Sequence, residues 1–186
     1  MAKKIIVAIV GMAGSGKSTS SDHFSKLGLP VLRFGDQVDI GLSEQNLPLT
    51  QPNERKYRED LRTELGMEAM AIKIEPRVNK ALKSSDIVIL DGLYSWEEYL
   101  YLQKKFKNLF LLCIYSRPSI RYKRLKARTI RPLNKKEARS RDFAELENLN
   151  KGGPIAIADY LIKNNKQTKM LFPKLNQTLD LIKDSV

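Results

Sequence analysis

The chain has 186 residues and contains very few of the side chains that form covalent bridges or ligate transition metals. Its single cysteine, Cys113, excludes any disulfide within the chain, and this fits a reducing cytoplasm. Cys113 stands inside an apolar run, so we expect a small buried side chain. The single histidine, His23, falls on an expected helix, and we interpret it as a packing or surface residue.

The chain also lacks any hydrophobic run long enough to cross a membrane. The longest runs, at 5–10 and 109–115, have the length of strands. There are no internal repeats and no low-complexity linkers. We therefore expect residues 1–186 to form one domain with a core of its own, and no membrane contact.

The most informative feature present is a complete phosphate-binding loop. Residues 11–18 match the pattern G-x-x-x-x-G-K-[ST], between an apolar run and an expected helix at 17–27. In such a loop, backbone N–H groups converge on phosphate oxygens, Lys17 adds a positive charge and Ser18 offers a hydroxyl to Mg²⁺. A glycine-rich turn that binds nothing is the alternative, but the complete pattern in this context argues against it. The expected contacts to ATP are Gly11, Met12, Ala13, Gly14, Ser15, Gly16, Lys17, Ser18 and Thr19.

Strand-like and helix-like segments alternate along the chain. Strands are expected at 3–10, 30–34, 86–91, 108–115 and 158–163. Helices are expected at 17–27, 53–71, 76–84, 95–106, 117–128, 136–148 and 174–184, with an irregular stretch at 35–49 and a break at 151–154. Because the clearest strands are continuous apolar runs, we expect an α/β fold of the three-layer P-loop type. Its sheet would be five-stranded and mainly parallel, with helices on both faces.

Two carboxylates stand at the expected carboxyl ends of strands. Asp91 can hold the water shell of Mg²⁺ together with Ser18, or orient an attacking hydroxyl, although Asp-Gly is also common at ordinary strand ends. Asp36 follows the second strand, at the sheet edge where open α/β folds bind ligands. It can position an acceptor hydroxyl or simply cap a turn.

The net charge of +12 is concentrated in one window, 117–141, which holds eleven Lys and Arg residues and one acid, Glu137. Three interpretations are open: a solvated helical face, a surface that grips polyphosphate, and a nucleic-acid footprint. The arginines are interrupted by Thr-Ile-Arg-Pro-Leu-Asn at 129–134, and this favours a mobile phosphate clamp over a plain helix.

Several short motifs fall in one order along the chain: the loop at 11–18, Gly35-Asp36, 61–66 (Leu-Arg-Thr-Glu-Leu-Gly), Asp91-Gly92, 141–146 and 157–164. In this order they resemble the adenylate-kinase-related, dephospho-CoA-kinase-like branch of small phosphate-loop kinases over nearly the whole chain. The resemblance implies an ATP- and Mg²⁺-dependent kinase, cytoplasmic, monomeric or homodimeric, that acts on a small-molecule phosphate acceptor.

The resemblance also implies an acceptor-binding helical insert at 36–80 and a basic lid at about 128–142. Carried over to this chain, the catalytic residues are Lys17, Asp36, Asp91, Arg128 and Arg131. Arg124 and Asn164 join the loop on the nucleotide side. The substrate-binding residues are Asp36, Arg62, Arg77, Arg139 and Arg141.

One position departs from the family pattern. Relatives that phosphorylate AMP-like acceptors carry Gly-Asp-x-x-Arg after the second strand, whereas this chain ends the motif with Asp39. A carboxylate there would repel a phosphate. Either Arg62 or Arg77 takes over, or the acceptor is not a nucleoside monophosphate, so a small nucleotide, a nucleoside and a related metabolite all remain open.

A second hypothesis comes from a different class of protein. A basic chain of this fold can be a nucleotide-dependent ATPase that binds RNA or assists assembly, with Tyr115, Tyr122 and Phe143 stacking on bases. A GTP-binding switch is disfavoured, because 163–166 reads Lys-Asn-Asn-Lys and the guanine-reading pattern Asn-Lys-x-Asp is missing.

Overall fold

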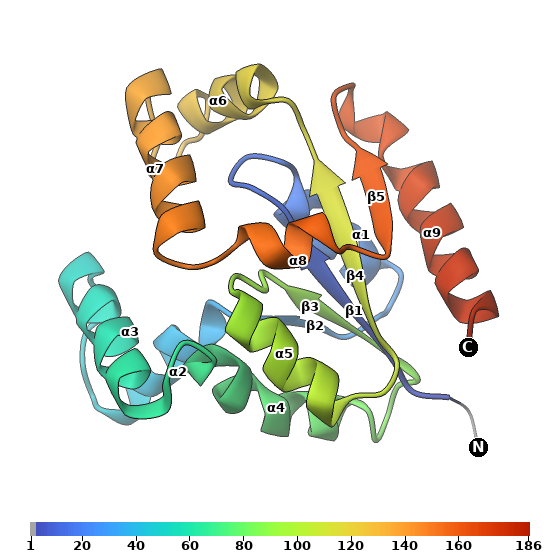
Figure 1. Ribbon diagram of the computed structural model, residues 1–186, viewed down its shortest axis with the longest axis horizontal. Coiled ribbons are helices and arrows are strands. Elements are labelled where there is room, and N and C mark those ends of the chain that lie inside the picture. The colour runs from blue at the N-terminus through green and yellow to red at the C-terminus, as the bar shows by residue number, and fades with distance from the viewer. Residues whose placement is uncertain (1–2) are drawn as a thin grey trace.

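The computed structural model describes residues 3–186, in which five strands form one sheet in the order β2-β3-β1-β4-β5 (Figure 1). The strands are β1 (Ile5–Val10), β2 (Val31–Arg33), β3 (Ile87–Asp91), β4 (Leu109–Tyr115) and β5 (Tyr160–Lys163). All four neighbouring pairs are parallel. The expected three-layer α/β fold is therefore confirmed.

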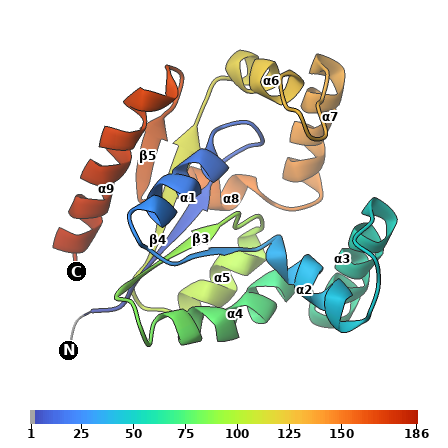
Figure 2. The same ribbon diagram turned by 180° about the vertical axis from the view of Figure 1, so that it is seen from behind.

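Helices cover both faces of this sheet. The α-helices of residues 3–186 are α1 (Lys17–Lys26), α2 (Asp36–Glu44), α3 (Gln51–Leu65), α4 (Ala69–Ala81), α5 (Trp96–Lys105), α6 (Pro118–Lys126), α7 (Lys135–Glu147), α8 (Gly152–Ala156) and α9 (Phe172–Asp184). One face carries α1 and α9, and the other carries α4, α5 and α8 (Figure 2).

Both faces of the central strands are buried, and this explains why the strands read as continuous apolar runs. On β1, Val7 and Ile9 pack with Phe24 and the apolar side of α9. Ile6 and Ala8 point the other way, into the cluster that α4 and α5 complete. The sheet is thereby a rigid platform whose carboxyl edge presents the loop after β1.

The prediction that 35–49 is irregular was wrong, because α2 spans much of it. Asp36 and Asp39 lie in the first turn of α2, where acidic side chains interact favourably with the helix dipole. Gly41 allows the ring of Tyr57 from α3 to pack directly on α2, since a Cβ at position 41 would overlap that ring. This long-range contact has no signature in the local sequence.

Helix boundaries after α2 also differ from the prediction. The expected helix at 53–71 is divided by Gly66, which has φ +82°, into α3 and α4. The helix expected at 76–84 begins earlier, at Ala69, and carries Pro76 in its interior. The expected break at 151–154 contains the short helix α8. Within 36–80, α4 packs on the sheet while α3 stands apart from it (Figure 1).

Cys113 is buried with 1% of its surface exposed, as expected, and burial raises the pKa of its thiol to about 11. His23 stacks on Phe172 with ring centroids 4.5 Å apart and contacts Asn176, which agrees with a packing role. Across residues 3–186, none of the helices combines the length and the apolarity that a membrane crossing requires.

Candidate functional site

The loop between β1 and α1 depends on glycine at three positions. Gly11, Gly14 and Gly16 have φ values of +140°, +78° and +111°. A Cβ on Gly14 would lie 2.8 Å from the backbone oxygen of Arg121, and one on Gly11 would overlap the backbone oxygen of Ile114. The loop is therefore held tightly against β4 and α6 in a conformation that other residues rarely adopt.

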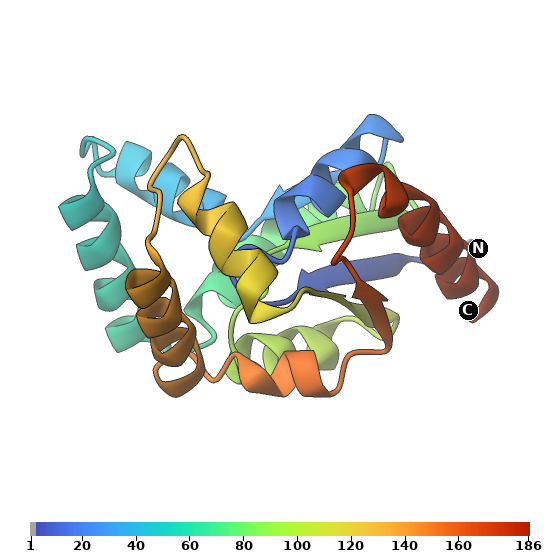
Figure 3. The same cartoon turned by 90° about the horizontal axis from the view of Figure 1, so that it is seen from above.

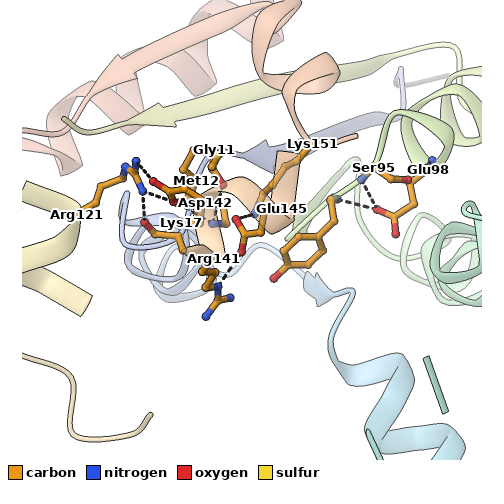
Figure 4. Close-up of polar contacts among 12 residues, drawn as sticks. Gly11, Met12, Lys17, Ser95, Glu98, Arg121, Arg141, Asp142, Glu145 and Lys151 are labelled. Carbon is orange, nitrogen blue, oxygen red and sulfur yellow. Dashed lines mark hydrogen bonds and ion pairs between the residues drawn. The ribbon is translucent and has the colours of Figure 1, made fainter. Parts of the chain in front are cut away.

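Lys17 is folded back onto this loop. Its Nζ donates to the carbonyl oxygens of Gly11 (2.9 Å) and Met12 (3.3 Å) (Figure 4). Burial, assisted by the nearby charge of Lys151, lowers the pKa of Lys17 to about 7. From this position the Lys17 ammonium group can exchange its two carbonyl acceptors for the oxygens of a phosphate bound at the loop.

A first cleft, of about 320 Å³, lies over the loop and the start of α1; we call it the donor cleft. Its lining residues are Gly14, Gly16, Lys17, Ser18, Thr19, Arg124, Arg128, Asn164 and Thr168. Arg124 and Asn164 both support the carbonyl oxygen of Ser15, at 3.3 Å from Nη1 and 2.8 Å from Nδ2. Two residues assigned to the nucleotide side from the sequence thus contact the loop and line the cleft.

A second cleft, of about 440 Å³, joins the first; we call it the transfer cleft. It is lined by Ala13, Lys17, Ser18, Arg33, Gly35, Asp36, Val38, Asp39, Leu49, Glu54, Arg58, Asp91, Gly92, Tyr94, Arg128, Arg131, Arg141, Glu145 and Lys151. Lys17, Ser18 and Arg128 line both clefts. The transfer cleft therefore begins where the loop would hold the end of a triphosphate chain.

Ser18 and Asp91, expected to hold Mg²⁺, both line the transfer cleft. Burial raises the pKa of Asp91, while Lys17 and Arg33 act in the opposite direction. In the described part of the chain, no three His, Cys, Asp or Glu residues form a metal-binding group. A hydroxyl and one carboxylate are hard oxygen ligands, and they fit Mg²⁺ because this ion usually completes its octahedron with phosphate oxygens and waters.

The predicted acceptor residues are only partly brought together. Asp36 lines the transfer cleft, but it pairs with Arg77 at 3.4 Å, and Arg77 is not among the residues that line the clefts described here. Asp39 also lines the transfer cleft and leaves that wall acidic.

The lid arginines divide into two groups. Arg128, Arg131 and Arg141 line the transfer cleft, and Arg131 Nη2 lies 3.1 Å from Glu54 on α3. This ion pair joins the loop between α6 and α7 to the helix on the opposite side of the cleft. Arg139 is exposed, lies over the ring of Phe143 at 5.6 Å and does not line these clefts. The structure therefore separates Arg139 from the other predicted substrate-binding residues of the lid.

A buried ion cluster beneath the lid was not anticipated from the sequence. Lys151, with 1% of its surface exposed, donates to Glu145 at 2.7 Å and lies over the ring of Tyr94 at 4.5 Å. Arg141 Nε donates to the other oxygen of Glu145 at 2.9 Å. Burial alone would raise the pKa of Glu145, but the two cations more than offset this and lower it. The bond through Nε leaves the terminal nitrogens of Arg141 available to the cleft.

A third cleft, of about 380 Å³, continues from the transfer cleft toward α3 and α5; we call it the acceptor cleft. It is lined by Phe34, Gly35, Val38, Arg58, Arg62, Met70, Tyr94, Glu98, Arg131, Arg141, Glu145 and Leu149. Arg62 was expected here. Glu98 was not, although the Ser-x-x-Glu pattern at 95–98 is a recognisable capping box.

The chain is similar to known proteins both in sequence and in fold. A family model described as "AAA domain" matches residues 7–151. A UPF0200 protein of Thermococcus kodakarensis is 34% identical over 182 residues, covering 96% of this chain and 98% of the relative.

Among solved structures, a shikimate kinase of Bacteroides thetaiotaomicron superposes with a TM-score of 0.61 at 14% identity, covering 95% of this chain and 98% of that one. A gluconokinase of Sinorhizobium meliloti superposes with a TM-score of 0.56 at 16% identity, covering 99% and 95%. At these identities the likeness establishes the fold alone, a P-loop NTPase-like fold.

Proposed function

This chain belongs to the UPF0200 protein family and carries an AAA domain, and we propose that it is a phosphotransferase. It would move the γ-phosphoryl group of MgATP to a small nucleotide, nucleoside or related metabolite. The kinship with adenylate-kinase-related and dephospho-CoA-kinase-like proteins is part of this proposal. The kinase names of the structures with a similar fold support the reaction class.

The observation that carries the proposal is the continuity of the three clefts. Lys17 and Ser18 belong to both the donor and the transfer cleft, and Arg131 and Arg141 belong to both the transfer and the acceptor cleft. A donor and an acceptor molecule can therefore approach each other across a short space lined by cations. Phosphoryl transfer requires this arrangement, since negative charge is concentrated between the two reactants.

Residues of the chain can be assigned to each part of the reaction. The nucleotide, when bound, supplies the phosphoryl group and the leaving group. Lys17 would leave the two loop carbonyls and donate to phosphate oxygens, and Ser18 and Asp91 would hold Mg²⁺. The terminal nitrogens of Arg141 would grip oxygens of the migrating group, because a guanidinium binds two oxygens at once.

Two further residues would complete the site. Arg131 would close it from the opposite side, where it already contacts α3 through Glu54. Asp36 lines the transfer cleft and would orient the attacking oxygen. No covalent nucleophile is needed for this chemistry.

The positions of the basic residues favour this function over RNA binding. Arg121 is buried, Arg124 contacts the loop, and Arg128, Arg131 and Arg141 line the transfer cleft. Four of the eleven cations in the window 117–141 therefore line the clefts of the nucleotide site, and a fifth, Arg121, is paired with Asp142 in the interior.

The test is ATP turnover measured against a panel of nucleosides, nucleoside monophosphates and dephospho-CoA. We expect at least one acceptor to raise turnover well above the acceptor-free rate, and Lys17→Ala to abolish it. Lys26→Ala, an exposed lysine on the same helix, is the matched control and should behave as wild type. ATP hydrolysis that no acceptor stimulates, together with RNA affinity that falls steeply with salt, would overturn the kinase proposal in favour of a nucleotide-dependent ATPase that binds RNA.

A further inference from the structure

The end of the acceptor cleft farthest from the loop combines one carboxylate, one guanidinium and an apolar wall. The residues that line the acceptor cleft but not the transfer cleft are Phe34, Arg62, Met70, Glu98 and Leu149. Any part of an acceptor that lies beyond the reacting group must meet these side chains. These side chains would therefore contact the part of an acceptor that differs from one acceptor to another.

The two carboxylate oxygens of Glu98 differ in their hydrogen-bond partners. Oε2 accepts hydrogen bonds from the backbone N–H groups of Tyr94 (2.7 Å) and Ser95 (3.2 Å), which completes the capping box of α5 (Figure 4). Oε1 has no hydrogen-bond partner among residues 3–186, although the residue is 99% buried. Oε1 is not among the fully enclosed oxygens that lack a partner, and Glu98 lines the acceptor cleft, so this oxygen is placed to accept a hydrogen bond from a molecule in that cleft.

Arg62 lines the same cleft as Glu98 and carries the opposite charge. Its charge acts on Glu98, yet the two groups form no ion pair within 4.0 Å, and the guanidinium of Arg62 has no hydrogen bond or ion pair with any side chain in the described range. The side chain is half-buried and held on α3, on the other side of the cleft. A hydrogen-bond acceptor and a set of donors thus face the same space without satisfying each other.

We propose that Glu98 and Arg62 together recognise the distal end of the phosphate acceptor by a flat, uncharged edge that carries a hydrogen-bond donor next to a hydrogen-bond acceptor. The donor of the ligand would bond to Glu98 Oε1 and its acceptor would receive a bond from Arg62. Such an edge is found on amides and nitrogen heterocycles. Phe34, Met70 and Leu149 provide apolar surface for the faces of a flat group.

The same pair disfavours an acceptor that ends in a free carboxylate. Above pH 7, where Glu98 is largely ionised, such a group would meet the Glu98 oxygen, and two carboxylates in one apolar site repel each other. Burial already raises the pKa of Glu98 to about 7, against the opposing effect of its two backbone hydrogen bonds and of Arg62. This part of the site therefore selects for the chemistry of the distal end, separately from the chemistry of transfer.

The inference rests on the proposed phosphotransfer, and the decisive variant is Glu98→Gln. The glutamine oxygen can accept from the same two backbone N–H groups, so the cap of α5 is kept, while an amide donor replaces the acceptor that faces the cleft. We expect the KM for the acceptor to rise about 10- to 100-fold, as for the loss of a hydrogen bond to a charged group, with the KM for ATP unchanged. Arg62→Gln should shift the acceptor KM in the same direction.

Two controls separate recognition from structure. Glu97→Gln makes the identical change one residue earlier, at a side chain that bonds Asn150 outside the clefts, and should leave the acceptor KM unchanged. Ser95→Ala removes the other half of the capping box and should lower the melting temperature without raising the acceptor KM. An acceptor KM that is the same in Glu98→Gln and wild type would show that Glu98 only caps the helix, and would overturn the inference.

The chemical class is tested with the same proteins. Nucleosides, nucleoside monophosphates and dephospho-CoA carry a heterocyclic edge, whereas shikimate and gluconate end in a carboxylate. At pH 8, where Glu98 is largely ionised, we expect turnover with members of the first set only; turnover with the second set alone would refute the assignment.

If no compound supports turnover, the phosphotransfer proposal fails. The inference about Glu98 and Arg62 is then tested by binding alone, measured as the shift in melting temperature that each compound causes. A heterocyclic compound that stabilises wild type but not Glu98→Gln supports it. Equal stabilisation of both proteins, or none of either, contradicts it.

Discussion

Arg121 and Asp142 form a two-bond ion pair in the interior, with Nη1 to Oδ1 at 2.8 Å and Nη2 to Oδ2 at 2.7 Å. The pair joins α6 to α7, and Nη1 of the same guanidinium also donates to the carbonyl oxygen of Ala13 in the phosphate-binding loop at 3.1 Å. Burial alone would lower the pKa of Arg121, but Asp142 raises it, so the charge is retained. The lid is thereby connected to the loop by a charged contact whose two side chains line none of the three clefts.

We predict that Asp142→Ala lowers the free energy of unfolding by about 3–5 kcal/mol, because it leaves a buried guanidinium without its partner. Denaturant unfolding measures this directly. Asp180→Ala removes an exposed carboxylate that pairs with Lys183 one helical turn away, and should cost less than about 1 kcal/mol. Equal effects of the two substitutions would contradict the structural role of the interior pair.

Lys17 should take up a proton when a nucleotide binds. Its pKa in the empty protein is about 7, so near pH 8 the amine is largely neutral, whereas phosphate oxygens favour the ammonium form. Calorimetric titration with ATP in two buffers of different ionisation enthalpy should give an uptake of roughly one proton per site. Lys17→Met should abolish this uptake; an unchanged uptake in that variant would place the proton elsewhere.

The same pKa shift predicts how the stability of the empty protein depends on pH. The unfolded chain has the ordinary lysine pKa of 10.5 and the folded chain a pKa of about 7, so between these values the unfolded state binds more protons. The cost of burying the charged amine is therefore fully present below pH 7 and is relieved as the pH rises toward 10.5. Urea unfolding of wild type at pH 7 and pH 9, compared with Lys17→Met, should show this rise in wild type only.

Arg131 should matter for turnover far more than for stability. The residue lines the transfer and acceptor clefts, but its ion pair with Glu54 is made by an exposed side chain and contributes little to folding. We expect Arg131→Ala to lower kcat about 100-fold, the size of effect seen when one charge-stabilising donor is removed, with no change in melting temperature. Arg139→Ala is the matched lid control. If it reduces kcat as much as Arg131→Ala, the two groups of lid arginines are not functionally distinct.

Asp91 should determine how much Mg²⁺ the reaction requires. Chelation is expected to abolish turnover, and Asp91→Asn to raise the Mg²⁺ concentration for half-maximal rate by roughly tenfold or more. Asp22→Asn is a suitable comparison, since Asp22 also pairs with Arg33, at 2.7 Å, and does not line the clefts. A Mg²⁺ requirement that is the same in both variants would argue against Asp91 as the metal carboxylate.

The parts of the molecule that could be predicted from the sequence are those that depend on local pattern. The strands are continuous apolar runs because both faces of the sheet are covered, and the loop is recognisable because glycine and lysine must occupy fixed positions within eight residues. These features predicted the fold and the placement of Lys17 and Ser18 in the clefts.

The parts that escaped prediction depend on contacts between distant segments. Lys151 stands in a glycine-rich stretch whose local sequence gives no sign that its amine is buried against Glu145 and Tyr94. Glu98 looks like a capping residue, and only the packing of α3 against the cleft places it beside Arg62. Arg77 and Arg139 illustrate the opposite case, since their residue type suited a phosphate site but the fold directs them to Asp36 and Phe143.

The separation between α3 and the sheet, seen from above in Figure 3, has a consequence for how such proteins diversify. Of the side chains unique to the acceptor cleft, Arg62 belongs to α3, which lies at the side of the molecule away from the sheet, and Glu98 and Leu149 stand at or just beyond the ends of helices. In the proposed phosphotransferase, substitutions there would change the acceptor while leaving the phosphate-binding loop intact. The residues of the acceptor cleft would therefore be able to change during evolution independently of the phosphate-binding loop. A chain would keep an easily recognised donor site while its acceptor changes.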